Sequence, residues 1–202
     1  MPGRANQKAR TRKAIVDACR ELTRSGAEVT MPKIAERALV SEATAYRYFP
    51  DLVSLLQEAL AGVWPPPEQA LAPVAGSKDP AERVAFAAEY LLNGVHDYEG
   101  SVRAMIAHTL TVPGAAKARP GIRFGLIDYA LAPFEGRLAP EAMTQLKLDL
   151  AVPVSAEALF TLTDLCGLPP PDAIASASHT AATLTRAAFV TTPGEPERRP
   201  AA

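Results

Sequence analysis

Residues 30–50 read TMPKIAERALVSEATAYRYFP, and this stretch decides the fold that we expect for the chain. Thr30 is a good N-cap, and Pro32 falls in the first turn, where its missing N–H costs little. Apolar residues then recur at i, i+3, i+4 and i+7, the spacing of one helical face: Met31, Ile34, Ala35 and Ala38. The pattern predicts a packed helix, with Lys33, Glu36 and Arg37 facing away from the core.

A second helix is expected a few residues further on. Leu39 and Val40 close the first helix, and Ser41 is an N-cap that starts the next. Ala45 and Phe49 lie four residues apart and should both point to the core. The opposite face then carries Glu42, Ala43, Tyr46 and Arg47. Two helices joined so closely must cross at a steep angle, and the second presents large hydrogen-bonding groups to a partner.

Such a helix suits the major groove of DNA. The hydroxyls of Thr44, Tyr46 and Tyr48 can bind phosphates, while Arg47 or Glu42 reaches base edges. One competing interpretation is that YRYF is the aromatic end of a core helix, because aromatic residues at helical spacing more often pack than bind DNA. Another is a dimeric helical adaptor whose YRYF patch binds protein. Added salt should weaken DNA binding steeply and should spare an apolar protein contact.

The stretch resembles the DNA-binding pattern of the TetR/AcrR family of bacterial transcriptional regulators, T-x-x-x-I-A-x-x-A-G-V-S-x-x-T-L-Y-x-Y-F-x-x-K-x-x-L-L. The chain matches it at Thr30, Ile34, Ala35, Ala38, Val40, Ser41, Thr44, Tyr46, Tyr48, Phe49, Leu55 and Leu56. It departs from it where Leu39 replaces the usual turn glycine and where Leu52 replaces a lysine that often contacts phosphate. The first departure bears on the turn, because leucine tolerates a positive φ badly.

The resemblance implies a homodimeric one-component regulator whose DNA head extends from Ala9 to about Phe49. Ten residues are predicted to contact DNA: Arg12, Thr30, Lys33, Ser41, Glu42, Ala43, Thr44, Tyr46, Arg47 and Tyr48. The resemblance also implies that the last two helices of each subunit form a four-helix dimer interface. We expect a repressor that binds a palindromic operator and is released by a small, largely apolar effector.

Composition and charge agree with a regulator of this kind. The chain has 202 residues, of which 48% are hydrophobic and 21% charged, as in an ordinary soluble globular protein. It lacks an apolar run long enough for a membrane span or a signal peptide, so a cytoplasmic protein is expected. Residues 1–48 hold ten Lys or Arg against five Asp or Glu, and residues 49–202 hold eleven against seventeen. A basic front end fits a DNA-binding module attached to a domain that does not touch DNA.

The pattern divides the chain into a DNA-binding domain at 1–50, an effector-binding and dimerisation domain at 51–192, and a disordered tail at 193–202. Residues 1–9 should form a mobile arm. The first helix should end at Ser25–Gly26 and carry an apolar stripe of Ile15, Ala18, Cys19 and Leu22. A connecting helix should run from Leu52 to Trp64, followed by a proline-rich surface loop as far as Pro80.

Every segment after Asp79 has a helical pattern, so the expected fold is all-α. Two stripes come first, one of Val84, Ala87, Ala88, Leu91 and Val95, and one of Val102, Met105, Ile106 and Leu110 that Pro113–Gly114 ends. Residues 120–138 should form a central helix, because apolar residues go nearly all round it: Ile122, Phe124, Leu126, Ile127, Leu131 and Phe134. Two long helices should follow at about 140–166 and 171–191, the first bent or broken at Pro153. Small residues such as Ala181 and Ala182 suit packing on a twin subunit, although packing within one subunit remains an alternative.

The chain offers no constellation typical of an enzyme. His96, His108 and His179 lie on different expected helices without metal-ligand spacing, and no nucleophile elbow or phosphate-binding glycine loop occurs. We therefore expect no catalysis, no cofactor and no metal. Cys19 and Cys166 should be reduced thiols in apolar surroundings. Six residues with aromatic bodies or polar tips are candidates for the effector site, or for ordinary core: Phe86, Tyr90, His108, Phe124, Tyr129 and Phe160.

Overall fold

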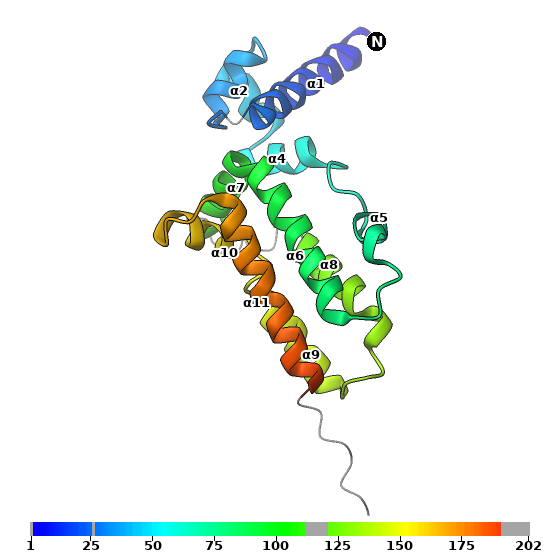
Figure 1. Ribbon diagram of the computed structural model, residues 1–202. Helices are drawn as coiled ribbons and strands as arrows, with labels where there is room; N and C mark the ends of the chain where they lie inside the picture. Colours follow the sequence, from blue (N-terminus) through cyan, green and yellow to red (C-terminus); the bar gives the residue numbers. More distant parts are fainter. Residues whose placement is uncertain (1, 26, 112–120, 191–202) are drawn as a thin grey trace, which may run out of the picture. The chain divides into compact units, whose positions relative to one another are not determined.

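The computed structural model describes residues 2–25, 27–111 and 121–190, and every regular element in these ranges is helical (Figure 1). The expected all-α fold is therefore confirmed. The chain forms two compact units, the first from Met1–Pro65 with Gly94–Pro120 and the second from Pro66–Asn93 with Gly121–Ala202. The boundary falls inside helix α6 (Pro80–Asp97). Among the described helices, none combines the length and the apolar character that crossing a membrane requires.

The first unit contains α1 (Pro2–Arg24), α2 (Met31–Arg37), α3 (Glu42–Tyr48), α4 (Leu52–Leu60) and α7 (Glu99–Thr111). Helix α1 already begins at Pro2, so the mobile arm expected at residues 1–9 is wrong for residues 2–9. Alanine, arginine, glutamine and lysine prevail in this segment and favour helix, and a proline at the first helical position loses no hydrogen bond. Gly26, the expected end of this helix, lies outside the described residues.

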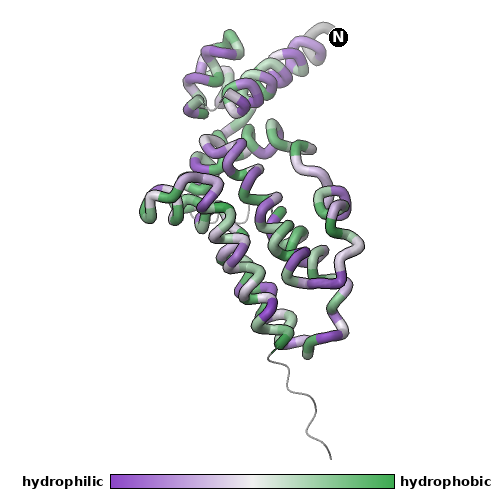
Figure 2. The backbone as a smooth tube through the Cα atoms, viewed as in Figure 1, coloured by the Kyte–Doolittle hydropathy of each residue, from purple (hydrophilic) through white to green (hydrophobic). Residues whose placement is uncertain are grey.

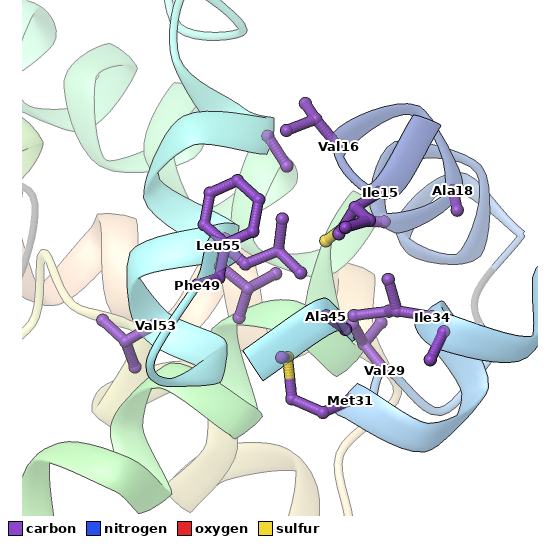
Figure 3. Packing of buried hydrophobic residues seen from close by; sticks show 14 of the residues in the cluster. Ile15, Val16, Ala18, Val29, Met31, Ile34, Ala45, Phe49, Val53 and Leu55 are labelled. Atoms are coloured by element: carbon purple, nitrogen blue, oxygen red, sulfur yellow. The ribbon is translucent and has the colours of Figure 1, made fainter. Parts of the chain in front are cut away.

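Apolar side chains from all of these helices share one core. Figure 3 shows Ile15 and Val16 of α1 near Phe49 and Leu55, and Met31 and Ile34 of α2 close to Ala45. The expected stripe positions on α1 and α2 are buried except for Leu22 and Ala38, which are partly buried against the same core. Met105 of α7 also belongs to it, so a segment distant in sequence completes the packing of the helix-turn-helix.

Helix α4 ends at Leu60, and its expected continuation to Trp64 is wrong. Ala61 leaves the helical region with a ψ of 124°, and Gly62 has a φ of +78°, a conformation that glycine adopts without strain. Trp64 then lies against the last turn of α6. A Cβ added to Gly94 would come within 2.0 Å of the indole Cη2, and the indole centroid is 6.5 Å from the ring of Tyr98. The missing side chain of Gly94 leaves the space that the indole fills.

A buried polar contact joins α1 to α7. The hydroxyls of Thr23 and Ser101 are 2.8 Å apart, and the two residues are only 3% and 1% exposed. Cys19 lies one turn before Thr23, and burial raises the pKa of its thiol to about 11, although the hydrogen bond with Thr23 opposes this shift. Cys19 thus has the expected apolar surroundings, whereas Cys166 is exposed, contrary to the expectation.

The second unit contains most of α6 together with α5 (Pro67–Ala70), η1 (Ala72–Val74), α8 (Ile122–Leu131), η3 (Ala132–Phe134), α9 (Pro140–Leu150), α10 (Ala156–Phe160), the π-helical η4 (Thr161–Leu165) and α11 (Pro170–Val190). The proline-rich segment before Pro80 is not simply a surface loop, because it forms α5 and η1 and buries Leu71 completely. Prolines in the first turns of both elements need no N–H there.

Arg83 of α6 is 2% exposed and binds the ends of two neighbouring elements. Its guanidinium donates to the carbonyls of Ala130 and Tyr129 at 2.8 and 3.0 Å, and to those of Val74 and Ala75 at 2.8 and 2.9 Å. These carbonyls lie at the C-terminal ends of α8 and η1, where intrahelical donors are lacking and a cation is favoured. Arg83 therefore joins α6, η1 and α8 within the second unit.

Two shorter helices replace the single one expected at 140–166. Helix α9 ends at Leu150, and Ser155 caps α10 by accepting a hydrogen bond from the N–H of Ala158 at 3.1 Å. Pro153 lies between them, so the interruption predicted there is confirmed. Proline disfavours the helical conformation of the residue before it. The first N–H groups of the new helix lack intrahelical acceptors, and the Ser155 side chain supplies one acceptor.

The expected apolar stripes are only partly buried. All five residues of the first stripe on α6 are buried, whereas Leu110 at the end of the second is 81% exposed. The predicted central helix stops at Leu131, and its Phe124 is 52% exposed. Pro113–Gly114 and the tail at 193–202 lie outside the described residues.

Helix α11 packs its small residues into its own subunit. Its buried face is formed by Ala173, Ile174, Ala177, Ser178, Ala181, Ala182 and Thr185. In Figure 2 hydrophobic and hydrophilic residues alternate along this helix, as in a helix with one buried face. Ala181 and Ala182 are 0% and 3% exposed in the single chain, so the expectation that they face a twin subunit is wrong. Sequence periodicity identifies such a face but not the chain against which it packs.

Candidate DNA-binding site

The turn between α2 and α3 has the geometry of a Schellman motif. The N–H of Val40 donates to the carbonyl of Ala35 at 3.0 Å, and that of Leu39 to Glu36 at 3.1 Å. This motif needs a left-handed residue after the C-cap, and Leu39 supplies it with a φ of +56°. Among the described residues it alone has a positive φ without being glycine. Leucine at the family's glycine position therefore keeps the turn at the expense of backbone strain.

Both helices of the motif begin where the sequence predicts. Thr30 is the N-cap of α2, but its side chain makes no capping hydrogen bond; the N–H of Ile34 donates to the Thr30 carbonyl instead. Ser41 caps α3 through its side chain, which accepts from the N–H of Thr44 at 3.2 Å. The hydroxyls of Ser41 and Thr44 are also 2.9 Å apart. These contacts fix the first turn of α3.

The two faces of α3 divide as predicted. Ala45 and Phe49 are 0% and 2% exposed, which places them in the core. Glu42, Ala43, Tyr46 and Arg47 are all exposed on the outer face. Thr44 and Tyr48 are half-buried, and Tyr48 packs against the core cluster while the Arg47 guanidinium carbon lies 5.7 Å from its ring centroid. The outer face thus presents a carboxylate, a phenol and a guanidinium around one small side chain.

Arg12 has a structural role that sequence analysis missed. Its guanidinium binds both carboxylate oxygens of Glu58 on α4, with Nε–Oε1 at 3.0 Å, and donates to the carbonyl of Tyr48 at 3.3 Å. The guanidinium carbon also lies 4.3 Å from the centroid of the Phe49 ring. Arg12 therefore ties α1 and α4 to the C-terminal end of α3. The pairing with Glu58, far away in sequence, has no local signal.

Two further positions, the predicted contact Lys33 and the family's lysine position at Leu52, present little charge to DNA. Lys33 is paired with Glu28 at 2.7 Å, and this hydrogen bond and the lysine charge lower the pKa of the Glu28 carboxyl. Leu52, which stands where the family often has lysine, is partly buried against the core. Lys33 can exchange its partner for a phosphate, because both members of the pair are exposed.

The six predicted effector residues do not line one described cavity. Five lie in the second unit, while His108 lies on α7 in the first. Phe86, Tyr90, Tyr129 and Phe160 are half-buried, and burial raises the pKa of the Tyr90 hydroxyl. Tyr129 has the Arg83 guanidinium carbon 5.6 Å from its ring centroid, so it contributes to the packing around that buried cation.

A separate groove of about 620 Å³ occurs in the second unit between the α9–α10 connection, α10, η4 and α11. Its apolar lining includes Val152, Pro153, Leu162 and Leu184. Arg123 lies on its wall and donates to Glu157 and to the carbonyl of Ala151, both at 3.2 Å. A mostly apolar groove with one ion pair can bind a small molecule or another apolar surface.

Comparison with known families accounts for the DNA-binding geometry. Residues 15–59 match the family model described as bacterial regulatory proteins of the tetR family. The matched segment contains α2, the strained turn, α3 and almost all of α4, together with the C-terminal part of α1 from Ile15 onward. No curated protein matched the chain in a further search. The helix-turn-helix, its outward recognition face and the matched segment together identify the chain as a DNA-binding transcriptional regulator whose DNA-binding head is of the TetR type.

Proposed function

We propose that this regulator is a repressor that binds a two-fold symmetric operator as a homodimer and leaves it when a small, largely apolar effector binds. The observation that carries the proposal is the outer face of α3, where Glu42, Tyr46 and Arg47 are exposed and the opposite residues are buried. A short helix held in this way enters a major groove and reads a few base pairs, so that two copies are needed for a long site.

Exposed apolar residues of the second unit support dimerisation. Val152 and Leu165, which lie in the elements that precede α11, are 72% and 82% exposed, and exposed apolar side chains are available to a partner subunit. Helix α11 adds an outer face with Ala175 and His179, both exposed. We therefore propose the outer face of α11, with the elements before it, as the contact between subunits.

The groove in the second unit supports effector binding. Its volume of about 620 Å³ lies within the range of about 300–1,000 Å³ found for small-molecule sites, and its lining is mostly apolar. The aromatic residues Phe86, Tyr90 and Tyr129 remain a second candidate place. A thermal-shift screen for compounds that also release DNA would identify effectors. Leu162→Arg should abolish the response if the groove binds them, and Tyr90→Ala if the aromatic set does.

The central test is selection of bound sequences from a random DNA pool. Recovery of a palindrome with two half-sites is the expected result, and Tyr46→Ala with Arg47→Ala should abolish binding while the circular dichroism spectrum stays unchanged. If Arg47 binds a guanine, its loss should cost about 1–3 kcal/mol at one base position. Selection of no consensus, or a double variant that still protects the operator, would contradict the proposal. Loss of fold in that variant would favour a core role for YRYF.

A further inference from the structure

A second groove, of about 930 Å³, lies in the first unit between the N-terminal half of α1 and the helix-turn-helix. Gln7, Lys8 and Thr11 line it on the side of α1. The other side is formed by the turn residues Leu39, Val40 and Ser41, and by Thr44, Arg47 and Tyr48 of α3. None of the predicted DNA contacts came from the first two turns of α1, where helix was not expected.

The chemistry of this groove favours an anionic ligand with many oxygen atoms. Lys8 and Arg47 supply two cations, four further residues supply hydroxyl groups, and no carboxylate occurs among the described residues that line it. Lysine, arginine, threonine, serine and tyrosine are the side chains that commonly bind phosphate and sugar in protein–DNA complexes. The groove in the second unit differs, because Asp149 and Glu157 line it beside Arg123.

Leu39 supplies an apolar wall at the edge of the same groove. Its side chain is 93% exposed, and its backbone has a strained φ of +56°. An exposed leucine side chain contributes no hydrophobic free energy to folding, and the left-handed conformation favours glycine over leucine. Both features disfavour leucine in the free protein, and an apolar surface that covers the side chain would compensate for them by burying it. The C–H surface of deoxyribose, which alternates with phosphate along a strand, is such a surface.

We propose that this groove seats the sugar–phosphate backbone of one DNA strand, with Lys8 and Thr11 bound to phosphates and Leu39 packed on deoxyribose. The inference rests on the proposed operator binding of α3 and adds contacts from α1 and the turn. These contacts are independent of sequence, so they raise affinity for operator and for random DNA alike. They also position the strand beside α3, whose residues Thr44, Arg47 and Tyr48 line the same groove.

The test compares three variants over a range of salt concentrations. Each phosphate contact made by a cation adds about 0.9 to the salt slope, and the proposed dimer carries Lys8 twice, so Lys8→Gln should make the slope less steep by about 1.8. Between about 50 and about 200 mM salt, the affinity of the wild type should therefore fall about 12-fold more than that of Lys8→Gln. Lys13→Gln is the matched control, because Lys13 lies on the same helix, pairs with Asp17 and does not line the groove. Its slope should equal that of the wild type.

Leu39→Gly should lower affinity for both DNAs without changing the salt slope, because no charge is removed. Equal slopes for Lys8→Gln and Lys13→Gln, or undiminished affinity of Leu39→Gly, would overturn the inference. A loss in Leu39→Gly that disappears when uracil replaces thymine would place Leu39 on a thymine methyl group and overturn the backbone contact. Failure of the proposed function differs from these outcomes, because the wild type itself would then show no preference for any DNA sequence.

Discussion

Leu39 combines a left-handed backbone with an almost fully exposed side chain, at a position where the Schellman motif normally has glycine. We predict that Leu39→Gly raises the free energy of unfolding by up to about 1 kcal/mol, because relief of strain outweighs the extra flexibility of glycine in the unfolded chain. Urea denaturation would measure the change. Leu39→Ala retains a Cβ and hence the strain, so its stability should stay close to that of the wild type. A less stable glycine variant would show that the Leu39 side chain contributes to folding.

Arg12 offers a second prediction, because its charge is already matched by Glu58. Replacing Arg12 by Gln should weaken operator binding through misplacement of α3 while leaving the salt slope unchanged. Arg12 bound to phosphate in both subunits would instead lower the slope by about 1.8. A double-mutant cycle with Glu58→Gln should give a coupling of only about 0.2–1 kcal/mol in stability, since the two side chains are 45% and 40% exposed. Fluorescence anisotropy at several salt concentrations and urea denaturation would measure both quantities.

At the scale of elements, Gly94 and Trp64 decide how the chain leaves α4. In an unobstructed helix Gly94→Ala would stabilise the protein by about 1 kcal/mol. Here the added Cβ would collide with the indole, so we predict destabilisation by about 1–3 kcal/mol. Thermal denaturation would give the sign, and the emission of Trp64, the single tryptophan of the chain, should shift as the ring becomes exposed. A more stable alanine variant would mean that the indole does not occupy this position.

The sequence predicts helices well where a local signal marks their ends. Ser41 caps a helix as expected, helix α6 begins directly after Asp79 where the helical pattern resumes, and the buried faces of α2, α3 and α6 follow the apolar spacing. Prediction fails where distant packing decides, as at Leu60, where Gly62 and the site for Trp64 end a helix whose apolar pattern continues. The same holds for the DNA-binding face. Its exposed residues on α3 follow from periodicity, whereas the pairing of Arg12 with Glu58 depends on three-dimensional neighbours.

At the scale of the molecule, the units are completed by segments far apart in sequence. Met105 of α7 belongs to the core of the DNA head, and Ser101 of α7 contacts the buried hydroxyl of Thr23 on α1. The packing of the DNA head therefore depends on a helix that comes later in the sequence than residues 66–93 of the second unit. Such an arrangement gives α7 a physical connection to the recognition helix through α1 and α4. An effector that binds more tightly to one position of α7 would then change DNA affinity by its difference in binding free energy between the two positions, typically about 1–3 kcal/mol.

Dimerisation is the last prediction, and the two faces of α11 make it testable. Ala175 is exposed and Ala181 is fully buried within its own subunit, so arginine at the two positions should have different effects. Ala175→Arg should leave a folded monomer, because the charged side chain meets solvent in the free chain and a twin helix in the dimer. Ala181→Arg should lower the melting temperature itself, because it forces a charge into the core of the second unit.

Sedimentation and operator titration would separate these outcomes. The two heads of a dimer bind half-sites that lie one helical turn of about 34 Å apart, or a multiple of it, and they bind both half-sites at the same time. The monomeric Ala175→Arg variant should therefore bind a full operator about 100-fold more weakly or worse, while its affinity for an isolated half-site stays that of the wild-type head. A dimer that persists in Ala175→Arg would move the interface away from the outer face of α11. A stable Ala181→Arg monomer would instead mean that the inner face of this helix meets the second subunit.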